Sequence, residues 1–323
     1  FSPHKKVSAL LQLQADRYEH NLTTYFNNTA AQGINFSRQL SAEIEKTLSS
    51  KKATFADVSD SQELITALEE NTYSLLYNTL QIADCSGAFI ILDATVNTKL
   101  SGARNSRAGT YLKFANVNTT RPTSGIILWA RGVHDIGHAN NLVFHNKWQL
   151  EFDVSRIPFY DFVLKNASKE LVECYYYSPA FPFHGTWEEI MILCVPIVGK
   201  QGQVYGICGI EINSIYFKLL HAAAGADFDR VVGLVAQKKG DAILLDTGLE
   251  FGTKDGYFAG LAKGSLNRSP MQGLWHYHVA SSSGGSPKEF VGLDKTLSLS
   301  PLSNKEVGSS WVAVCMIPKE DYD

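Results

Sequence analysis

The segment with the densest chemically reactive side chains is "ARGVHDIGHANNLVFH", which covers residues 130–145. It holds three of the nine histidines of the chain, together with Asp135. Neutral imidazole nitrogens and carboxylate oxygens are the usual protein ligands of zinc and similar divalent ions. His134, Asp135 and His138 therefore form a candidate metal site, and a metal bound there would imply hydrolytic chemistry.

The letters "HDIGH" differ at one position from "HDIGK", the core motif of the HD-GYP metal-dependent phosphohydrolases. In those all-helical enzymes the motif lies on helices, with further ligands upstream and downstream. Here it follows a strand-like apolar run, Ile126–Arg131, and is flanked by Gly132 and Gly137, which favour a turn. We therefore expect a polar loop without a metal. A secreted metal-dependent hydrolase that uses this segment is retained as the alternative function.

The composition is that of a globular chain with enough apolar material for a core. Of 323 residues, 45% are hydrophobic and 19% are charged, and the net charge is −3. The absence of a basic block argues against nucleic-acid binding by this segment. The five cysteines form no Cys-x-x-Cys pair, which argues against a zinc ribbon or a redox motif. No nucleotide-binding or catalytic motif is found, so we expect no cofactor and no catalytic residue.

The first fifty residues carry the apolar stripe of one long helix. Leu11, Ala15, Tyr18 and Leu22 recur at steps of three and four residues. Gly33 interrupts the stripe and predicts a kink or weak point there. A second helix is predicted over residues 61–81. The stripe makes a parallel homodimer conceivable, although packing on the rest of the chain would explain it equally well.

The clearest β element is the hairpin "EEIMILCVPIVGKQGQVYGICGIEIN", residues 188–213. A register centred on Gln201 places Cys194 opposite Cys208, so a cross-strand disulfide is conceivable. Two unbonded buried thiols are the preferred interpretation. Pro196 inside the first strand predicts a sheet edge or a bulge.

The same register places Glu211 on an apolar face, beside a hollow left by Gly209. The other members of this face would be Met191, Leu193, Val195 and Ile207. A carboxylate in such surroundings requires a partner, either a bound cation or a protein cation.

A second cycle of elements begins near Arg230. It contains a hairpin over residues 230–246, a short helix over 255–264, and strands within 273–282, 289–300 and 309–317. A helix is predicted to start at Pro318, with acidic residues in its first turn. The chain thus shows two rounds of hairpin, short helix and antiparallel strands, which indicates an α+β fold.

Two parts of the sequence resemble the double Cache domains, the extracellular sensors of bacterial membrane receptors. The first part comprises "WQLEFDVSRIPFYDFV", "CYYYSPAF" and "TWEEIMILCVPIVGKQGQVYGICGIEINSIYF", and the second comprises "EFVGLDKTLSLSPL" and "SSWVAVCMIPKEDY". The resemblance implies a long N-terminal helix packed along two PAS-like modules with antiparallel sheets. It divides the chain into a helix and connector (1–60), a membrane-distal ligand-binding module (61–222) and a membrane-proximal module (223–323).

The resemblance also implies where a ligand would bind. "SRIPFY" looks like the ligand-contact segment of the distal module, which nominates Arg156, Phe159 and Tyr160. Amino-acid-binding members carry Asp where this chain has Glu211. The planar guanidinium of Arg156 suits a carboxylate, but a surface ion pair with Asp153 or Asp161 would also account for it. Five more aromatic residues either line the same pocket or belong to the core: Trp129, Trp148, Tyr175, Tyr177 and Trp187.

The predicted function is that of an extracellular small-molecule sensing domain in a membrane-anchored bacterial signalling protein. Its partner would be a small polar ligand, and an amino acid, a carboxylate and an amine all remain open. Attachment to the membrane would use flanking helices outside this sequence. The sequence leaves the output module open between a DNA-binding regulator, a cyclic-dinucleotide synthase, a kinase and a chemotaxis module.

Overall fold

The computed structural model describes most of the chain. The described ranges are residues 2–114, 127–131, 151–182, 189–222, 227–252, 264–280, 289–305 and 308–323, with the backbone alone for 127–131 and 304. The "HDIGH" segment, Trp148 and Trp187 lie outside these ranges, as does nearly all of the helix predicted over 255–264. The side chain of Trp129 is likewise not described.

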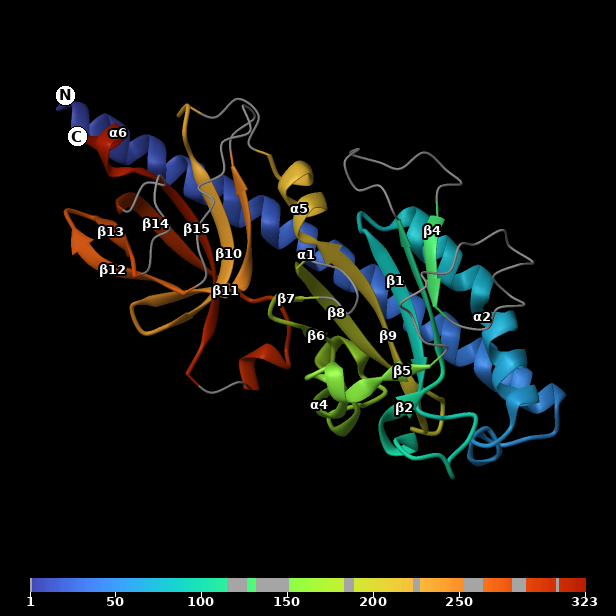
Figure 1. The fold of residues 1–323 in the computed structure, drawn as a ribbon. Helices are drawn as coiled ribbons and strands as arrows, with labels where there is room; N and C mark the ends of the chain where they lie inside the picture. The colour runs from blue at the N-terminus through green and yellow to red at the C-terminus, as the bar shows by residue number, and fades with distance from the viewer. Residues whose placement is uncertain are drawn as a thin grey trace.

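Helix α1 (Pro3–Ser50) runs along the whole molecule as one uninterrupted helix of 48 residues. At about 1.5 Å per residue it is roughly 70 Å long. Figure 1 shows its first half beside one β structure and its second half beside another. Apolar side chains from Leu11 to Leu48 are buried along one side. The chain's own sheets cover this stripe, and a homodimer through α1 stays a prediction.

Helix α1 continues through Gly33 without a break. A Cβ atom at this position would lie 2.6 Å from Cδ2 of Leu193, on strand β8 (Glu189–Val198). The glycine therefore allows the helix backbone to approach the sheet closely. The predicted second helix is confirmed as α2 (Gln62–Ile82), which begins where Ser61 Oγ accepts a hydrogen bond from the Leu64 amide.

The first β structure is an antiparallel sheet in the order β4-β3-β1-β9-β8-β6, with β7 also paired to β8. Its strands besides β8 are β1 (Gly87–Leu92), β3 (Gly109–Phe114), β4 (Ile127–Arg131), β6 (Tyr176–Tyr177), β7 (Phe181–Pro182) and β9 (Val204–Asn213). Helix α1 covers one face of this sheet. A second apolar cluster on the opposite face includes side chains of the short helix α4 (Tyr160–Lys165).

The second β structure is a closed antiparallel barrel, β10-β11-β12-β13-β14-β15. Its strands are β10 (Val232–Lys239), β11 (Ala242–Gly252), β12 (Ser265–Met271), β13 (Leu274–Val279), β14 (Glu289–Leu297) and β15 (Ser310–Pro318). Helix α5 (Ser214–Leu220) connects β9 to this half, and α6 (Lys319–Tyr322) follows Pro318 as predicted. None of the helices in the described ranges is both long and apolar enough to cross a membrane.

The register predicted for the β8–β9 hairpin is correct at its turn and wrong beyond it. Val198 pairs with Val204 as expected, but a bulge between Ile197 and Val198 shifts the following pairs by one residue. Cys194 therefore lies opposite Gly209 rather than Cys208. A shift of one residue moves every side chain to the other face of a strand. Pro196, predicted to mark an edge or a bulge, is next to this bulge.

The shift separates the two cysteines. Cys208 belongs to the apolar cluster beneath α1, whereas Cys194 belongs to the cluster on the α4 side. All five cysteines are free and buried.

We predict that a chromogenic thiol reagent will detect five thiols in the unfolded, unreduced protein. Three thiols would demonstrate a disulfide and contradict this arrangement.

The shift also replaces most of the predicted neighbours of Glu211. Ile207 shares its face as expected, but Met191, Leu193 and Val195 lie on the α1 side. The predicted hollow at Gly209 is filled by Phe89 of β1, the residue paired with it. A Cβ atom on Gly209 would meet the carbonyl oxygen of Leu193 and would lie 2.5 Å from the Phe89 ring.

We predict that Gly209→Ala will lower the free energy of unfolding by about 1–3 kcal/mol, because the added methyl group overpacks a closed site. Urea-induced unfolding measures this change. Gln203→Ala, in the exposed turn of the same hairpin, is the control and should change stability by less than about 0.5 kcal/mol. Equal effects of the two substitutions would contradict the close packing at Gly209.

Candidate functional site

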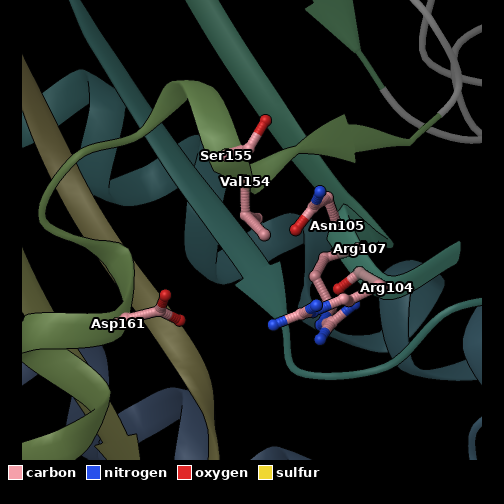
Figure 2. A pocket seen from close by; sticks show the side chains of 6 residues that line it. All are labelled: Arg104, Asn105, Arg107, Val154, Ser155 and Asp161. Atoms are coloured by element: carbon pink, nitrogen blue, oxygen red, sulfur yellow. The ribbon is translucent and has the colours of Figure 1, made fainter. Parts of the chain in front are cut away.

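A pocket of about 470 Å³ lies between two loops on the α4 side of the sheet. Figure 2 shows Arg104 and Arg107 on one side of it and Asp161 on the other. The remaining lining residues are Asn105, Val154 and Ser155. The first loop contains the 3₁₀ turn η2 (Ala103–Asn105) and strand β2 (Ser106–Arg107), and the second contains η3 (Val154–Arg156). Two guanidinium groups and one carboxylate give the pocket walls a positive balance.

Arg107 is held firmly in this wall. Its Nε donates a hydrogen bond to Asp93 Oδ1 at 2.9 Å, and its NH1 donates to three backbone carbonyls of its own loop. Burial alone would lower the pKa of Arg107, but the hydrogen bond to Asp93 raises it overall. The guanidinium is therefore a fixed positive charge whose orientation does not depend on a ligand.

Tyr160, nominated from the sequence, is buried and is not one of the lining residues. Its hydroxyl donates to Asp93 Oδ1 at 2.9 Å, so one carboxylate oxygen accepts hydrogen bonds from both Tyr160 and Arg107. Burial raises the pKa of Tyr160 well above its ordinary value. The residue thus remains a neutral hydrogen-bond donor and fixes the carboxylate that orients Arg107.

Arg156 and Phe159 are placed differently from each other. The side chain of Arg156 is 60% exposed, and its Nε lies 3.5 Å from Asp153 Oδ2, which is the surface ion pair considered in the sequence analysis. It is not among the lining residues, although its neighbours Val154 and Ser155 are. Phe159 is buried, with its ring 5.9 Å from the rings of both Tyr176 and Phe181. It therefore belongs to the apolar layer below the loop.

Glu211 is fully buried and has several protein partners. Its Oε1 accepts hydrogen bonds from Tyr111 at 2.8 Å and from Lys113 Nζ at 3.1 Å, and its Oε2 accepts one from Ser86 at 2.5 Å. The Lys113 side chain is itself only 4% exposed. The cation that the sequence required for Glu211 is therefore supplied by the protein, and the pair links β9 to β3.

Tyr175 and Tyr177 lie on the side of α1. Tyr177 is fully buried, and its hydroxyl donates to the carbonyl oxygen of Phe26 in α1 at 2.6 Å. Tyr175 is half-buried against the same apolar cluster. Tyr176, which the sequence analysis passed over, instead packs on the α4 side with Phe159. The structure therefore assigns Tyr177 to the packing of α1 on the sheet.

The lining residues and the partners of Glu211 were not found from the sequence. Arg104 and Arg107 stand in a loop without any motif. Lys113 carried a usable signal, because it is the one charged residue in the apolar segment "GTYLKF", Gly109–Phe114. A lysine in a buried strand calls for a carboxylate on a neighbouring strand, and Glu211 was the obvious candidate.

We predict that Glu211→Gln will lower the free energy of unfolding by about 3–5 kcal/mol, because it removes the carboxylate charge that pairs with the buried Lys113 ammonium. Urea-induced unfolding measures the loss. The matched test is the cycle completed by Lys113→Met and by the double variant, which should lose much less than the sum of the single changes. Additive losses would show that the two charges are not coupled.

Comparison with known proteins gives a match in structure only. No family model matches the sequence, and no curated protein matches it. Among solved structures, the periplasmic sensory domain of the Campylobacter jejuni chemoreceptor Tlp1 is 12% identical; the match covers 99% of this chain and 98% of that one, with a TM-score of 0.51. The ligand-binding domain of the Pseudomonas fluorescens chemoreceptor CtaA is 10% identical over 98% of this chain and 99% of that one, with a TM-score of 0.49.

The match to Tlp1 extends over both β structures and the long helix. The chain therefore has the α+β fold of a chemoreceptor sensory domain, as expected from its resemblance to the double Cache domains.

Proposed function

We propose that the protein is an extracellular small-molecule sensing domain of a membrane-anchored bacterial signalling protein. The observation that carries this proposal is the fold, which is shared along nearly the full length with a periplasmic sensory domain. In this proposal residues 1–60 form the helix and connector, residues 61–222 the distal ligand-binding module, and residues 223–323 the proximal module. The domain passes the signal of ligand binding to the rest of the signalling protein and catalyses no reaction.

The arrangement of the chain ends supports attachment to one membrane. The start of α1 and the helix α6 lie side by side at the barrel end of the molecule (Figure 1), and the rings of His4 and Tyr322 stack at 4.6 Å. Segments that continue from the two ends would leave the domain together. The pocket lies in the other half, which supports ligand binding in the part of the domain that is distant from the membrane.

The charges of the pocket support a ligand with an acidic group. Arg104 would hold a carboxylate, since a guanidinium offers paired donors in a planar fork. The fixed positive charge of Arg107, whose Nε and NH1 already donate within the protein, would attract the same group. Asp161, on the opposite wall, would accept a hydrogen bond or an ammonium group from the same ligand. Glu211 is already paired with Lys113, so its carboxylate has a counter-ion without any ligand.

Signalling follows from linkage between the ligand and two arrangements of the domain. A ligand shifts such an equilibrium only by its different affinity for the two arrangements. The pocket lies between the η2 loop and the η3–α4 segment. Hydrogen bonds to Asp93, which follows the end of β1, hold both Arg107 of the first segment and Tyr160 of the second. A ligand that draws these segments together alters how α4 rests on the sheet. The opposite face of that sheet packs against α1, which also contacts the barrel.

We predict that an acidic small molecule, at about 100 times its dissociation constant, will add roughly 2.7 kcal/mol to the stability of the protein. This corresponds to several degrees in Tm for a chain of this size. A thermal-shift screen with amino acids, small carboxylates, amines, purines and sugars measures the effect. Arg104→Gln should abolish the shift.

Arg156→Gln is the matched comparison, because the sequence nominates Arg156 and the pocket nominates Arg104. We expect Arg156→Gln to keep the shift. A shift lost in Arg156→Gln and kept in Arg104→Gln would move the site to the "SRIPFY" surface. No shift with any compound, together with metal-dependent hydrolysis lost in His134→Ala/His138→Ala, would favour the hydrolase.

A further inference from the structure

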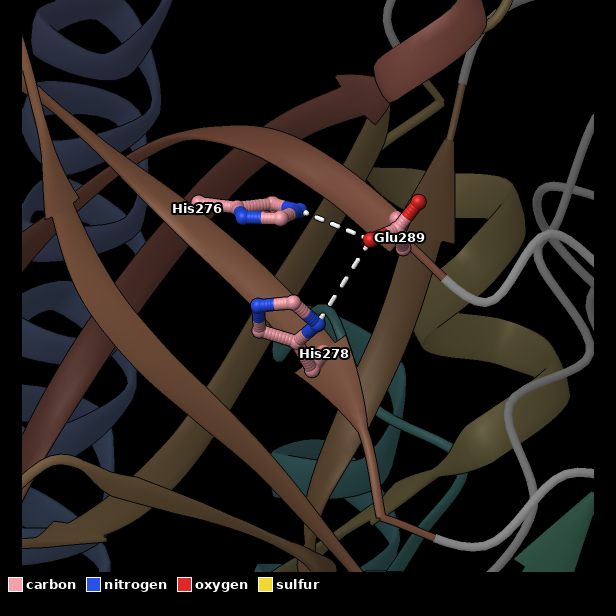
Figure 3. Close-up of side chains that lie close together, drawn as sticks. All are labelled: His276, His278 and Glu289. Carbon is pink, nitrogen blue, oxygen red and sulfur yellow. Dashed lines mark ion pairs between the residues drawn. The ribbon is translucent and has the colours of Figure 1, made fainter.

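Two histidines and a glutamate converge on the barrel, away from the pocket. His276 and His278 stand two residues apart on β13 and point to the same face, as alternate residues of a strand do. Glu289 of β14 is the residue paired with His278. Figure 3 shows both imidazole rings directed at the Glu289 carboxylate. Each residue offers one ligand atom, and the three atoms lie within 4.8 Å of one another.

The distances suit a tetrahedral metal ion. His276 Nε2 lies 3.3 Å from Glu289 Oε1, and His278 Nδ1 lies 3.7 Å from the same oxygen. Zinc binds such atoms at about 2.0–2.2 Å, which puts neighbouring ligands of a tetrahedron roughly 3.3–3.6 Å apart. The two distances to Glu289 are therefore close to those of a tetrahedral site, and the two imidazole nitrogens lie within 4.8 Å of each other.

His276 also lacks a normal hydrogen bond on the nitrogen that faces the site. Its Nε2 is buried and has no hydrogen-bond partner among the described residues, because the contact with Glu289 does not have hydrogen-bonding geometry. A buried polar atom without a partner is costly, and coordination would satisfy this nitrogen. The neighbouring cation, Lys319, donates a hydrogen bond to Asp323 at 2.8 Å.

We propose that His276, His278 and Glu289 bind a divalent transition-metal ion, with zinc as the best match. Two imidazoles and one carboxylate suit zinc, copper and nickel better than calcium or magnesium, which prefer oxygen ligands. Water fills the remaining coordination position. None of the three residues belongs to the lining of the proposed ligand pocket or to the "HDIGH" segment.

A metal ion at this site would link two strands close to the start of α6. Phe290, next to Glu289, pairs with Pro318, which directly precedes α6. An ion held by both strands would fasten β13 to β14 beside the start of α6. Metal binding would thus stabilise the end of the barrel from which the chain continues into α6.

Isothermal titration of the chelator-treated protein with zinc chloride tests the proposal. We expect one equivalent to bind with a dissociation constant in the micromolar range or below. His276→Ala/His278→Ala should weaken this binding at least 100-fold, and Glu289→Gln at least 10-fold. The control is His134→Ala/His138→Ala, which removes the other histidine pair and should leave the equivalent in place.

No binding by the wild type at 1 mM zinc would overturn the proposal, as would binding that only the control variant loses. A second equivalent, lost only in the control, would leave the barrel site intact. Circular dichroism without metal establishes that each variant is folded. If the double variant does not fold, Glu289→Gln decides alone, since this half-exposed side chain is not part of the core, and an unchanged affinity would refute its role.

Discussion

The burial of one face of a single helix against two separate β structures is the interaction on which the rest of the fold depends. Towards its start, α1 packs Tyr18 against Phe251 of the barrel, with ring centroids 4.8 Å apart. Further along, Phe26 packs against Tyr177 of the sheet at 5.1 Å. Each fully buried side chain of this size contributes about 1.5–3 kcal/mol. Because one helix makes both sets of contacts, it links the positions of the two β structures.

Polar contacts fix the rotation of α1 over the sheet. Ser37 and Ser41, both buried within the helix, donate to the carbonyl oxygens of Pro196 and Val198 at 2.6 and 2.8 Å. The pairing of β6 with β8 ends at Cys194. Pro196 and Val198 therefore belong to a part of β8 that β6 does not cover. Buried backbone carbonyls require a partner, and the two serines supply it. Near the bulge and Pro196, the two serines thus satisfy backbone carbonyls that no neighbouring strand of the described chain pairs with.

This arrangement sets how a bound ligand would be felt at a distance. The pocket and α4 lie on one face of the sheet, and α1 lies on the other. Strands β8 and β9, which separate them, are buried almost throughout. Tightly packed interiors transmit displacement rather than absorb it. In the proposed sensor, a change in the packing of α4 would therefore reach α1 through two rigid strands.

The sequence predicted the large elements because they follow simple periods. The stripe of α1, the range of α2 and the span of the β8–β9 hairpin were all correctly predicted. Strand β12 was missed, since "SLNRSPM" is polar and lacks an apolar alternation. The faces of β8 were wrong because a single bulged residue inverts them, and no local pattern marks its position. The pocket was missed for another reason: it joins loops some fifty residues apart, Arg104 to Ser155, and only the tertiary fold brings them together.

Amide hydrogen exchange, with and without the compound that gives the largest thermal shift, tests the proposed sensor mechanism most directly. The proposed mechanism predicts slower exchange in residues 103–107 and 154–161, which border the pocket, together with a change along α1. Protection confined to the barrel strands, or protection at the pocket with α1 unaltered, would contradict a sensor that works through its long helix.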